Sequence, residues 1–145
     1  MNSKKIAIEI LDYMLEHKPR ALPPEINGEI ARGEIGIMIY LYTYQNTEVF
    51  SGTLCKNLDV SSARISRALN RLEQKKLIMR NDAKSDMRLV KVELTAKGKK
   101  FVEEEKENAL KKIQSIVEFL GEEDTMQLIK IKNRIDEFLK NESKN

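Results

Sequence analysis

The segment DVSSARISRALNRLEQKKL, residues 59–77, decides the fold of this chain. Its apolar residues recur every three or four positions, so at about 100° per residue they share one side of a helix. Asp59, Ser61 or Ser62 can begin that helix, because each side-chain oxygen can accept a hydrogen bond from an amide of the first turn. We therefore predict an amphipathic helix whose apolar face consists of Ile65, Ala68, Leu69 and Leu72.

The opposite face of this helix is basic. Arg67, Asn70 and Arg71 lie on it together with the small residue Ala63, and no acidic residue precedes Glu73. A solvent-exposed helix normally mixes acidic and basic residues four positions apart, since such pairs stabilise it. A basic face without acids instead suits the major groove of DNA, where Arg reads guanine, Asn reads adenine and flanking guanidiniums hold phosphates.

Two short strands follow the basic helix. Residues 78–81 and 88–94 predict the strands, and the segment DAKSDM, residues 82–87, predicts the exposed turn between them. A turn that carries Lys84 and Arg88 beside the helix can reach the neighbouring minor groove or its phosphates. This arrangement is a winged helix-turn-helix.

Helices account for most of the remaining chain. Residues 3–18 and 51–58 have the apolar spacing of helices. Residues 33–44, apolar nearly all round, fit a buried helix or a buried strand, and their Ile and Tyr content leans toward a strand. The three prolines of the segment KPRALPPEINGE, residues 18–29, end the first helix. The predicted fold class is mainly α with a small β wing.

The last third of the chain predicts two more amphipathic helices. Thr95 can cap a long helix, Gly121 breaks it, and a final helix follows. These two helices and the first one have more apolar surface than one small module can cover, so we expect a second copy of the chain to bury it in a symmetric dimer. Two-fold symmetry also suits a palindromic DNA site. The residues of the final helix expected to point inward are Leu128, Ile131, Ile135 and Phe138.

Charge is distributed unevenly along the 145 residues. Residues 51–100 carry 13 Lys and Arg against 5 Asp and Glu, whereas the remainder carries 13 against 18. Basic charge concentrated in the middle third is typical of a module that faces a polyanion. No apolar run approaches the roughly 20 residues of a membrane span, no leader opens the chain, and a single cysteine fits a reducing compartment. We expect a cytoplasmic protein with no membrane partner.

Residues 61–101, SSARISRALNRLEQKKLIMRNDAKSDMRLVKVELTAKGKKF, resemble the core of the MarR family of bacterial and archaeal transcriptional regulators. The shared elements are a leucine-glutamate turn that ends the recognition helix, an Asp-x-Arg element in the wing and a Leu-Thr-x-x-Gly sequence that opens the dimerisation helix. These elements are specific when they occur together in this order. They stand here at Leu72-Glu73, Asp86-Met87-Arg88 and Leu94-Thr95-Ala96-Lys97-Gly98.

The resemblance implies a single MarR-like domain over residues 1–145. Residues 34–95 would form the winged-helix DNA-binding part, which makes the segment 33–44 a helix, and residues 1–20 and 96–141 would form the helical dimerisation part. The implied function is that of a sequence-specific DNA-binding transcriptional regulator. It would bind a pseudo-palindromic operator as a homodimer, usually as a repressor, and a small aromatic effector would release it.

The predicted site residues lie on the basic helix, on the wing and beside the effector pocket of the family. Arg88 corresponds to the wing arginine of the family. The tyrosines border the pocket and fit an aromatic effector or a filled core about equally well. The predicted DNA-binding residues are Ser61, Ser62, Ala63, Arg64, Ser66, Arg67, Asn70, Arg71, Lys84 and Arg88, and the predicted pocket residues are Tyr13, Tyr40 and Tyr44.

Two positions depart from the family pattern. Lys76 stands where the family commonly has Gly, and a positive φ there would cost on the order of 1 kcal/mol unless the turn is reshaped. Asn70 stands where many members have an acid that pairs with the wing arginine. With Asn70 that tether becomes at most a neutral hydrogen bond, which leaves the wing freer.

Other chemistry finds little support in the sequence. Cys55 beside Leu54 is explained by core packing, and it does not form a metal site with the single histidine, His17. There is no glycine-rich phosphate loop and no nucleophile with a base at motif spacing, so we expect neither an enzyme nor a cofactor.

Two further functions compete with DNA recognition. A winged-helix interaction module or antirepressor would keep the fold without DNA contact, but it would not need Arg64, Arg67 and Arg71 on one exposed face. Binding of structured RNA is a less well supported function, since the deep and narrow major groove of RNA excludes a helix.

Overall fold

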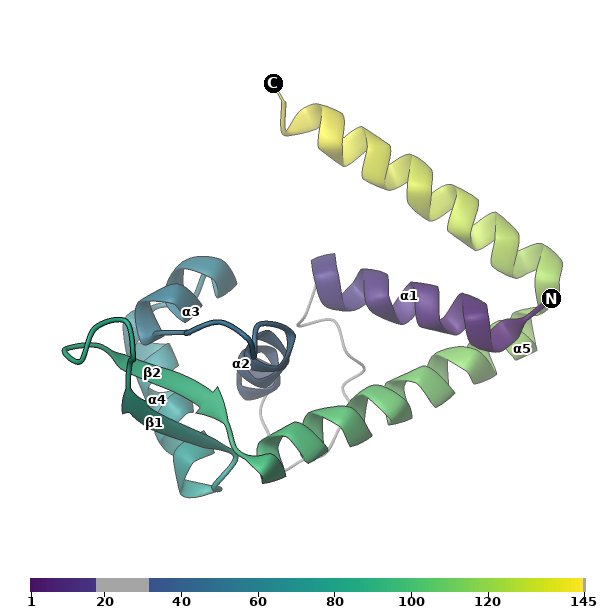
Figure 1. Cartoon of the computed structure of the whole chain (residues 1–145). Coiled ribbons are helices and arrows are strands. Elements are labelled where there is room, and N and C mark those ends of the chain that lie inside the picture. Colours follow the sequence, from purple (N-terminus) through teal and green to yellow (C-terminus); the bar gives the residue numbers. More distant parts are fainter. Residues whose placement is uncertain (18–31, 145) are drawn as a thin grey trace. The chain divides into compact units, whose positions relative to one another are not determined.

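The structure is a computed structural model that describes residues 1–17 and 32–144 (Figure 1). Four helices precede a two-stranded sheet, and a long helix follows it. This order confirms the predicted class, mainly α with a small β wing. The predicted break of the first helix at its three prolines lies outside the described residues. The elements are α1 (Ser3–His17), α2 (Arg32–Thr43), α3 (Ser51–Leu58), α4 (Ser62–Gln74), β1 (Ile78–Asp82), β2 (Val90–Leu94) and α5 (Ala96–Glu142).

The chain forms two compact units. One comprises residues 12–109 and contains α2, α3, α4 and both strands, and the other comprises residues 1–11 with 110–145. In the first unit α4 packs against α2, α3 and β1. The segment 33–44, ambiguous by its pattern, is helical, and it is apolar all round because α2 is buried on nearly every side in this unit. The large side chains buried here include Ile37, Met38, Leu54, Ile65, Leu69 and Leu72.

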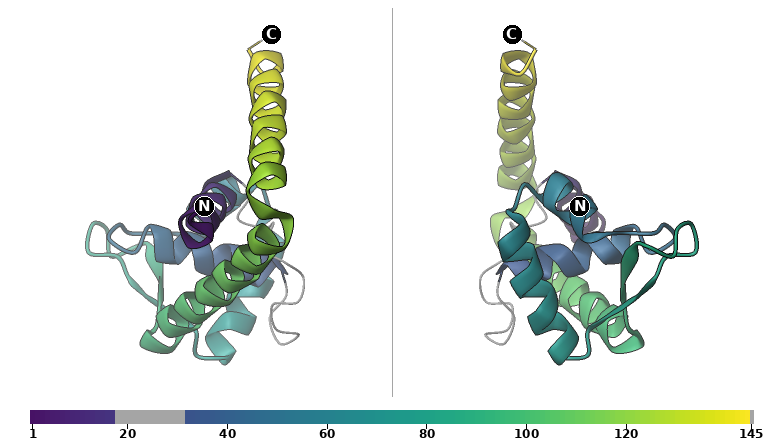
Figure 2. Two further views of the ribbon diagram at one scale, coloured as in Figure 1. Left: turned by 90° about the vertical axis from the view of Figure 1, so that its right-hand side faces the viewer. Right: turned by 90° about the vertical axis from the view of Figure 1, so that its left-hand side faces the viewer.

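The wing is an antiparallel pair whose register runs from Ile78 opposite Leu94 to Asp82 opposite Val90. The second strand therefore begins at Val90 and not at Arg88 as predicted, because Arg88 still belongs to the turn, where its backbone amide and its side chain bond Asp86. The turn lies at the outer edge of this unit in both views of Figure 2.

The ends of α4 follow the rules of helix capping. Ser61 is the N-cap, and its hydroxyl accepts a hydrogen bond from the Arg64 amide at 3.3 Å. Asp59, the other candidate cap, instead closes α3 in the left-handed conformation at φ 52°. Past the C-terminus of α4, the Lys76 amide bonds the Glu73 carbonyl and the Leu77 amide bonds the Leu72 carbonyl. This is the Schellman pattern, which needs a left-handed residue after the cap.

Lys76 is that left-handed residue, with φ 60°. The family commonly places glycine here, and the backbone has not been reshaped to accommodate the lysine. The Cβ of an L-residue crowds its own carbonyl in this conformation, at a cost of about 1–2 kcal/mol. The strain expected from the sequence is therefore present.

The Leu-Thr-x-x-Gly sequence joins the wing to α5. The Thr95 hydroxyl accepts a hydrogen bond from the Gly98 amide at 3.0 Å and donates one to the Lys76 carbonyl at 2.7 Å. A Cβ at Gly98 would lie 2.1 Å from the Leu77 carbonyl oxygen. The motif is thus explained by a cap at its threonine and by close backbone contact at its glycine.

The second unit contains the first part of α1 and most of α5. Ala7 and Leu11 of α1 are buried, and the Ser3 hydroxyl donates to the Glu118 carboxylate at 2.9 Å. Gly121, with φ 78° and ψ 177°, interrupts α5 as predicted, and Figure 1 shows the helix changing direction there.

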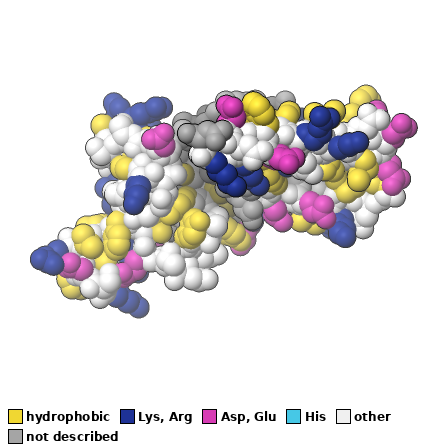
Figure 3. Space-filling model, turned by 90° about the horizontal axis from the view of Figure 1, so that it is seen from above, with side chains coloured by type: hydrophobic (Ala, Val, Ile, Leu, Met, Phe, Trp, Pro, Cys, Tyr) yellow, Lys and Arg dark blue, Asp and Glu magenta, His cyan; other side chains and the backbone are white. Residues whose placement is uncertain are grey.

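The apolar residues of the final helical segment are not inward in a single chain, so that prediction is wrong for the isolated chain. The fractional exposure of these residues is about half or more, and Figure 3 shows hydrophobic side chains exposed over this part of the chain. No residue in the described part of the chain covers them. The exposed residues of α5 are Ile116, Phe119, Met126, Leu128, Ile131, Ile135, Phe138 and Leu139.

Replacing Gly98 by alanine should destabilise the protein by about 1–3 kcal/mol, because the new methyl group meets a backbone oxygen that cannot swing away. Urea unfolding measures the change in the free energy of unfolding. Gly52→Ala is the matched control, since a Cβ at Gly52 meets nothing within 4 Å and alanine favours helix α3. Equal stability of the two variants would contradict the close contact at Gly98.

Lys76→Gly should raise the free energy of unfolding by up to about 1 kcal/mol, since the relief of left-handed strain exceeds the added entropy of glycine in the unfolded chain. Gln74→Gly, in the last turn of α4, should lower it by about 1 kcal/mol. Thermal and urea unfolding distinguish the two substitutions. A loss of stability at position 76 as large as at position 74 would contradict the assigned conformation.

Candidate nucleic-acid interface

The apolar face of α4 is buried, and this burial directs the opposite face to solvent. Ile65, Leu69 and Leu72 are at most 2% exposed. All predicted interface residues of α4 lie outside the core, and this exposure makes them available to a partner. The exposed residues are Ser61, Ser62, Ala63, Arg64, Ser66, Arg67, Asn70 and Arg71.

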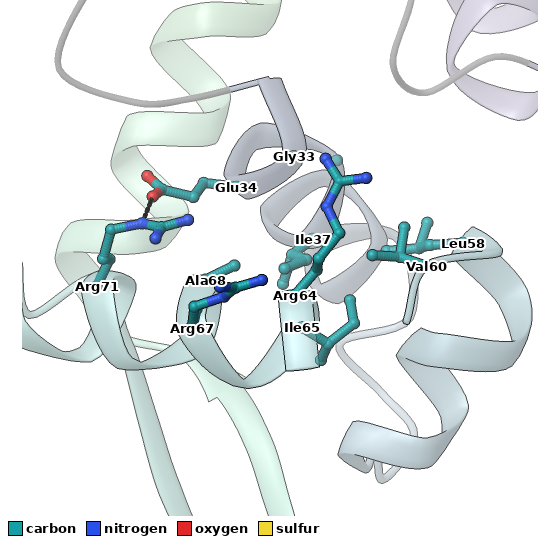
Figure 4. A pocket seen from close by; sticks show the side chains of 11 residues that line it. Gly33, Glu34, Ile37, Leu58, Val60, Arg64, Ile65, Arg67, Ala68 and Arg71 are labelled. Carbon is teal, nitrogen blue, oxygen red and sulfur yellow. Dashed lines mark hydrogen bonds and ion pairs between the residues drawn. The ribbon is translucent and has the colours of Figure 1, made fainter. Parts of the chain in front are cut away.

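A cavity of about 410 Å³ opens between α2 and α4. Figure 4 shows Arg64, Arg67 and Arg71 extending from α4 around it, above the apolar side chains of Ile37 and Ile65. Among the described residues, no carboxylate bonds the guanidinium of Arg64 or Arg67. The cavity therefore has a cationic rim and an apolar floor.

Arg71 is different from the two arginines before it. Its Nε lies 2.5 Å from Oε1 of Glu34 on α2, and Nζ of Lys75 lies 3.1 Å from Oε2 of the same carboxylate. The Glu34 side chain is only 2% exposed, whereas that of Arg71 is 51% exposed. From the sequence we expected Arg71 to lie on a face with no acid before Glu73, and this expectation missed Glu34, which comes from 37 residues earlier.

Asn70 bonds an arginine of the wing, but not the one expected. Its Oδ1 accepts a hydrogen bond from Nη2 of Arg80 on β1 at 2.7 Å. Nε of Arg80 also lies 3.3 Å from Oε2 of Glu73, at ion-pair distance but without hydrogen-bond geometry. Arg88 instead bonds Asp86, which lies in the same turn between the two strands of the wing. Arg80, and not Arg88, thus joins the wing to α4, through a hydrogen bond to Asn70 and an ion pair with Glu73, so the expectation of a tether that is at most neutral is wrong.

Glu48, another residue that sequence reasoning missed, anchors the turn of the wing. Its Oε1 accepts the Lys84 amide at 2.7 Å and the Ser85 amide at 3.3 Å, and its Oε2 accepts the Ser85 hydroxyl. The Ser85 hydroxyl is the main reason that the pKa of Glu48 lies below its ordinary value. The wing is therefore held at its turn by Glu48 as well as at β1 by Arg80.

The cations of the wing point to solvent. Lys84 is exposed, and the Arg88 side chain is 90% exposed. The Arg88 guanidinium bonds Asp86, and this bond lowers the pKa of the Asp86 carboxyl and raises that of Arg88. The bond lies at the surface, so Arg88 can exchange it for a phosphate at little cost.

Neither the cavity beside α4 nor the one beside the wing is lined by all three tyrosines of the predicted effector pocket. The rings of Tyr40 and Tyr44 are 4.5 Å apart, and the Tyr40 hydroxyl accepts a hydrogen bond from Asn57 at 2.7 Å. Tyr44 lines a polar cavity of about 180 Å³ beside the wing, whereas Tyr13 and Tyr40 line neither this cavity nor the one beside α4. The two rings are tilted against each other at 38°, and Tyr44 is 47% exposed.

Other chemistry is sparse in the described part of the chain. Cys55 is half-buried beside the buried Leu54, in accord with a packing role. The side chain of His17 lies outside the described residues. No group of three potential metal ligands occurs within residues 1–17 and 32–144. In the same ranges no helix combines the length and apolar character of a membrane span.

Comparison with known proteins places this geometry in a family. The profile of the family described as Transcriptional regulator SarA/Rot matches residues 27–105, more than half of the chain. The chain belongs to this family. It is therefore a transcriptional regulator of the winged-helix type, and the MarR-like character expected from the sequence is confirmed. A sequence search of curated proteins finds no match.

Solved structures share the fold of this SarA/Rot regulator. MepR, a transcription regulator of the Staphylococcus aureus multidrug efflux pump MepA, is similar with 23% identity and a TM-score of 0.69 over 94% of this chain and 92% of that one. YusO of Bacillus subtilis is 23% identical with a TM-score of 0.63, over 92% and 86%. A mutant of S. aureus MepR bound to an oligodeoxyribonucleotide is 26% identical with a TM-score of 0.61, over 92% and 89%.

Ser85→Ala should raise the pKa of Glu48 toward the ordinary carboxyl value, because the hydroxyl is the largest cause of its depression. Since the folded pKa is lowered, the anchor is complete at neutral pH and is lost as the pH falls through that lowered value. An NMR pH titration of the Lys84 amide reports the midpoint. Ser143→Ala serves as the control, and an identical midpoint in the Ser85 variant would refute this anchor.

Proposed function

We propose that this SarA/Rot-family regulator binds double-stranded DNA, with α4 in the major groove and the turn of the wing at the adjacent minor groove. The observation that carries the proposal is the pair of exposed guanidiniums of Arg64 and Arg67, which no described carboxylate neutralises. Unpaired cations along one helix face are available to phosphates and to base edges. The oligodeoxyribonucleotide complex of the MepR mutant supports the same use of this fold.

Small residues at the start of α4 support close approach to the duplex. Ser61, Ser62, Ala63 and Ser66 are all exposed, and none has a side chain long enough to keep the backbone away from a phosphate. Asn70 uses its oxygen to accept from Arg80, so its amide nitrogen is the group left to donate to a base acceptor.

The wing contributes phosphate contacts in this proposal. Lys84 stands on a turn that Glu48 holds in place, and the exposed Arg88 exchanges Asp86 for the DNA backbone. Contacts of this kind fix the register of a protein on the duplex but carry little sequence information. The long-range field of the lysine and the arginine also speeds association.

The active form in this proposal is a homodimer that represses transcription from a pseudo-palindromic operator. Residues 1–20 and 96–141 form the dimerisation part, and residues 34–95 form the DNA-binding part. Support comes from the half-exposed apolar side chains of α5, an apolar surface of the kind that a second copy covers. A small aromatic effector, bound beside Tyr13, Tyr40 and Tyr44, would release the dimer from DNA.

An interaction module without DNA contact is the alternative function. The pairing of Arg71 and Lys75 with Glu34 favours it, because that pairing removes positive charge from the face of α4. The two functions differ in salt dependence. Binding to DNA falls steeply with salt as counterions are released, whereas binding to a protein partner does not require such a slope.

Arg67→Ala should weaken binding to a duplex from the promoter region beside this gene by roughly 1–3 kcal/mol, through a lost base or phosphate contact. Lys84→Ala should weaken binding evenly for promoter and shuffled duplexes, since a phosphate contact is independent of sequence. Fluorescence anisotropy at several salt concentrations measures both effects, with Lys144→Ala as a control that removes the same charge near the chain end. Unchanged promoter binding by the Arg67 variant would show that α4 presents another face.

A further inference from the structure

Glu34 is a buried carboxylate to which the proposed DNA contacts give no role. It lies in the first turn of α2, where the partial positive charge of the helix N-terminus favours an anion. At 2% exposure it would be costly to bury alone, and it is stabilised because each oxygen meets one cation of α4. Arg71 and Lys75, the two cations, stand on consecutive turns of the helix.

The pairing leaves part of Arg71 free. Only Nε bonds Glu34, and the two terminal nitrogens of the guanidinium bond no residue in the described part of the chain. Half of the side chain is exposed. Figure 4 shows the guanidinium held against Glu34 from one side, with its terminal nitrogens on the side of Ala68 and Arg67. An arginine fixed in this way through Nε presents a preformed fork, and such a fork suits bidentate recognition.

The pairing also lowers the positive charge on the exposed face of α4. Glu34, Arg71 and Lys75 together carry one positive charge, whereas the two cations alone would carry two. One unit of attraction for any phosphate is thereby removed, whatever the DNA sequence. Attraction of this kind supplies essentially all of the affinity for non-specific DNA.

We propose that Glu34 is a specificity-determining positioning residue, which orients Arg71 for one contact on the operator and lowers the affinity for all other DNA. The proposal rests on the proposed DNA binding of α4. It assigns a function to a residue that touches no DNA itself. Its effect on recognition passes through Arg71.

The test compares Glu34→Gln with the wild-type protein on a promoter duplex and on a shuffled duplex of equal length. Glutamine keeps the size of the side chain but is uncharged, so it accepts a weaker hydrogen bond from the guanidinium and forms no ion pair with it. We expect tighter binding to the shuffled duplex, a salt slope steeper by about one, and about a tenfold fall in the ratio of promoter to shuffled affinity. An unchanged ratio and slope in the folded variant would overturn the proposal.

A double-mutant cycle separates positioning from a structural role. In the Arg71→Ala background, Glu34→Gln should no longer lower the affinity ratio, because the residue that it positions is absent. A fall as large as in the wild-type background would show that Glu34 acts on the fold of α2 instead. If the wild-type protein itself fails to bind either duplex with a salt-dependent affinity, the proposed function fails and the role of Glu34 fails with it, whereas intact wild-type binding with an unchanged ratio in the Glu34 variant overturns the role of Glu34 alone.

Glu34→Asp provides a second variant in case the glutamine variant does not fold. Aspartate keeps the negative charge but is shorter by one methylene group, so it should leave the salt slope at the wild-type value while lowering the affinity ratio. Circular dichroism establishes that each variant is folded. A wild-type ratio in the aspartate variant would overturn the positioning of Arg71.

Discussion

The burial of one face of α4 is the constraint on which the rest of this structure depends. Ile65, Leu69 and Leu72 are almost wholly removed from water, and each such side chain contributes about 1.5–3 kcal/mol to folding. Because a helix is rigid, this burial fixes where the residues on its other side point. The exposure of Arg64 and Arg67 is a consequence of hydrophobic packing, and it needs no further interaction.

Contacts from distant parts of the chain modify this simple arrangement. Glu34 on α2 pairs with Arg71 and Lys75 and leaves Arg64 and Arg67 without a described carboxylate partner. Glu48 before α3 bonds the turn of the wing. At the other end of α4, the close approach of Gly98 to Leu77 joins the wing to α5. The interface is therefore built by the packing of a whole unit and not by one helix.

Local patterns predicted most of the fold. The spacing of Ile65, Leu69 and Leu72 predicted α4, and the helix break at Gly121 and the strain at Lys76 were foreseen from single residues. The partners of charged side chains could not be foreseen, because Glu34 and Glu48 bond residues 36 or more positions away. The strand that carries Arg80 was predicted, but local spacing does not show which arginine reaches Asn70. The prediction that the apolar residues of the last helix point inward was wrong for the isolated chain, because such burial requires a partner.

The central claim is that two copies of α4 meet one duplex together. Selection of bound duplexes from a random pool tests it most directly, since the recovered sequences report DNA binding, symmetry and spacing at once. The account predicts enrichment of an inverted repeat whose half-sites are centred about one helical turn, roughly 10 base pairs, apart. Recovery of a pool with no enriched sequence, or of a single unrepeated site, would contradict it.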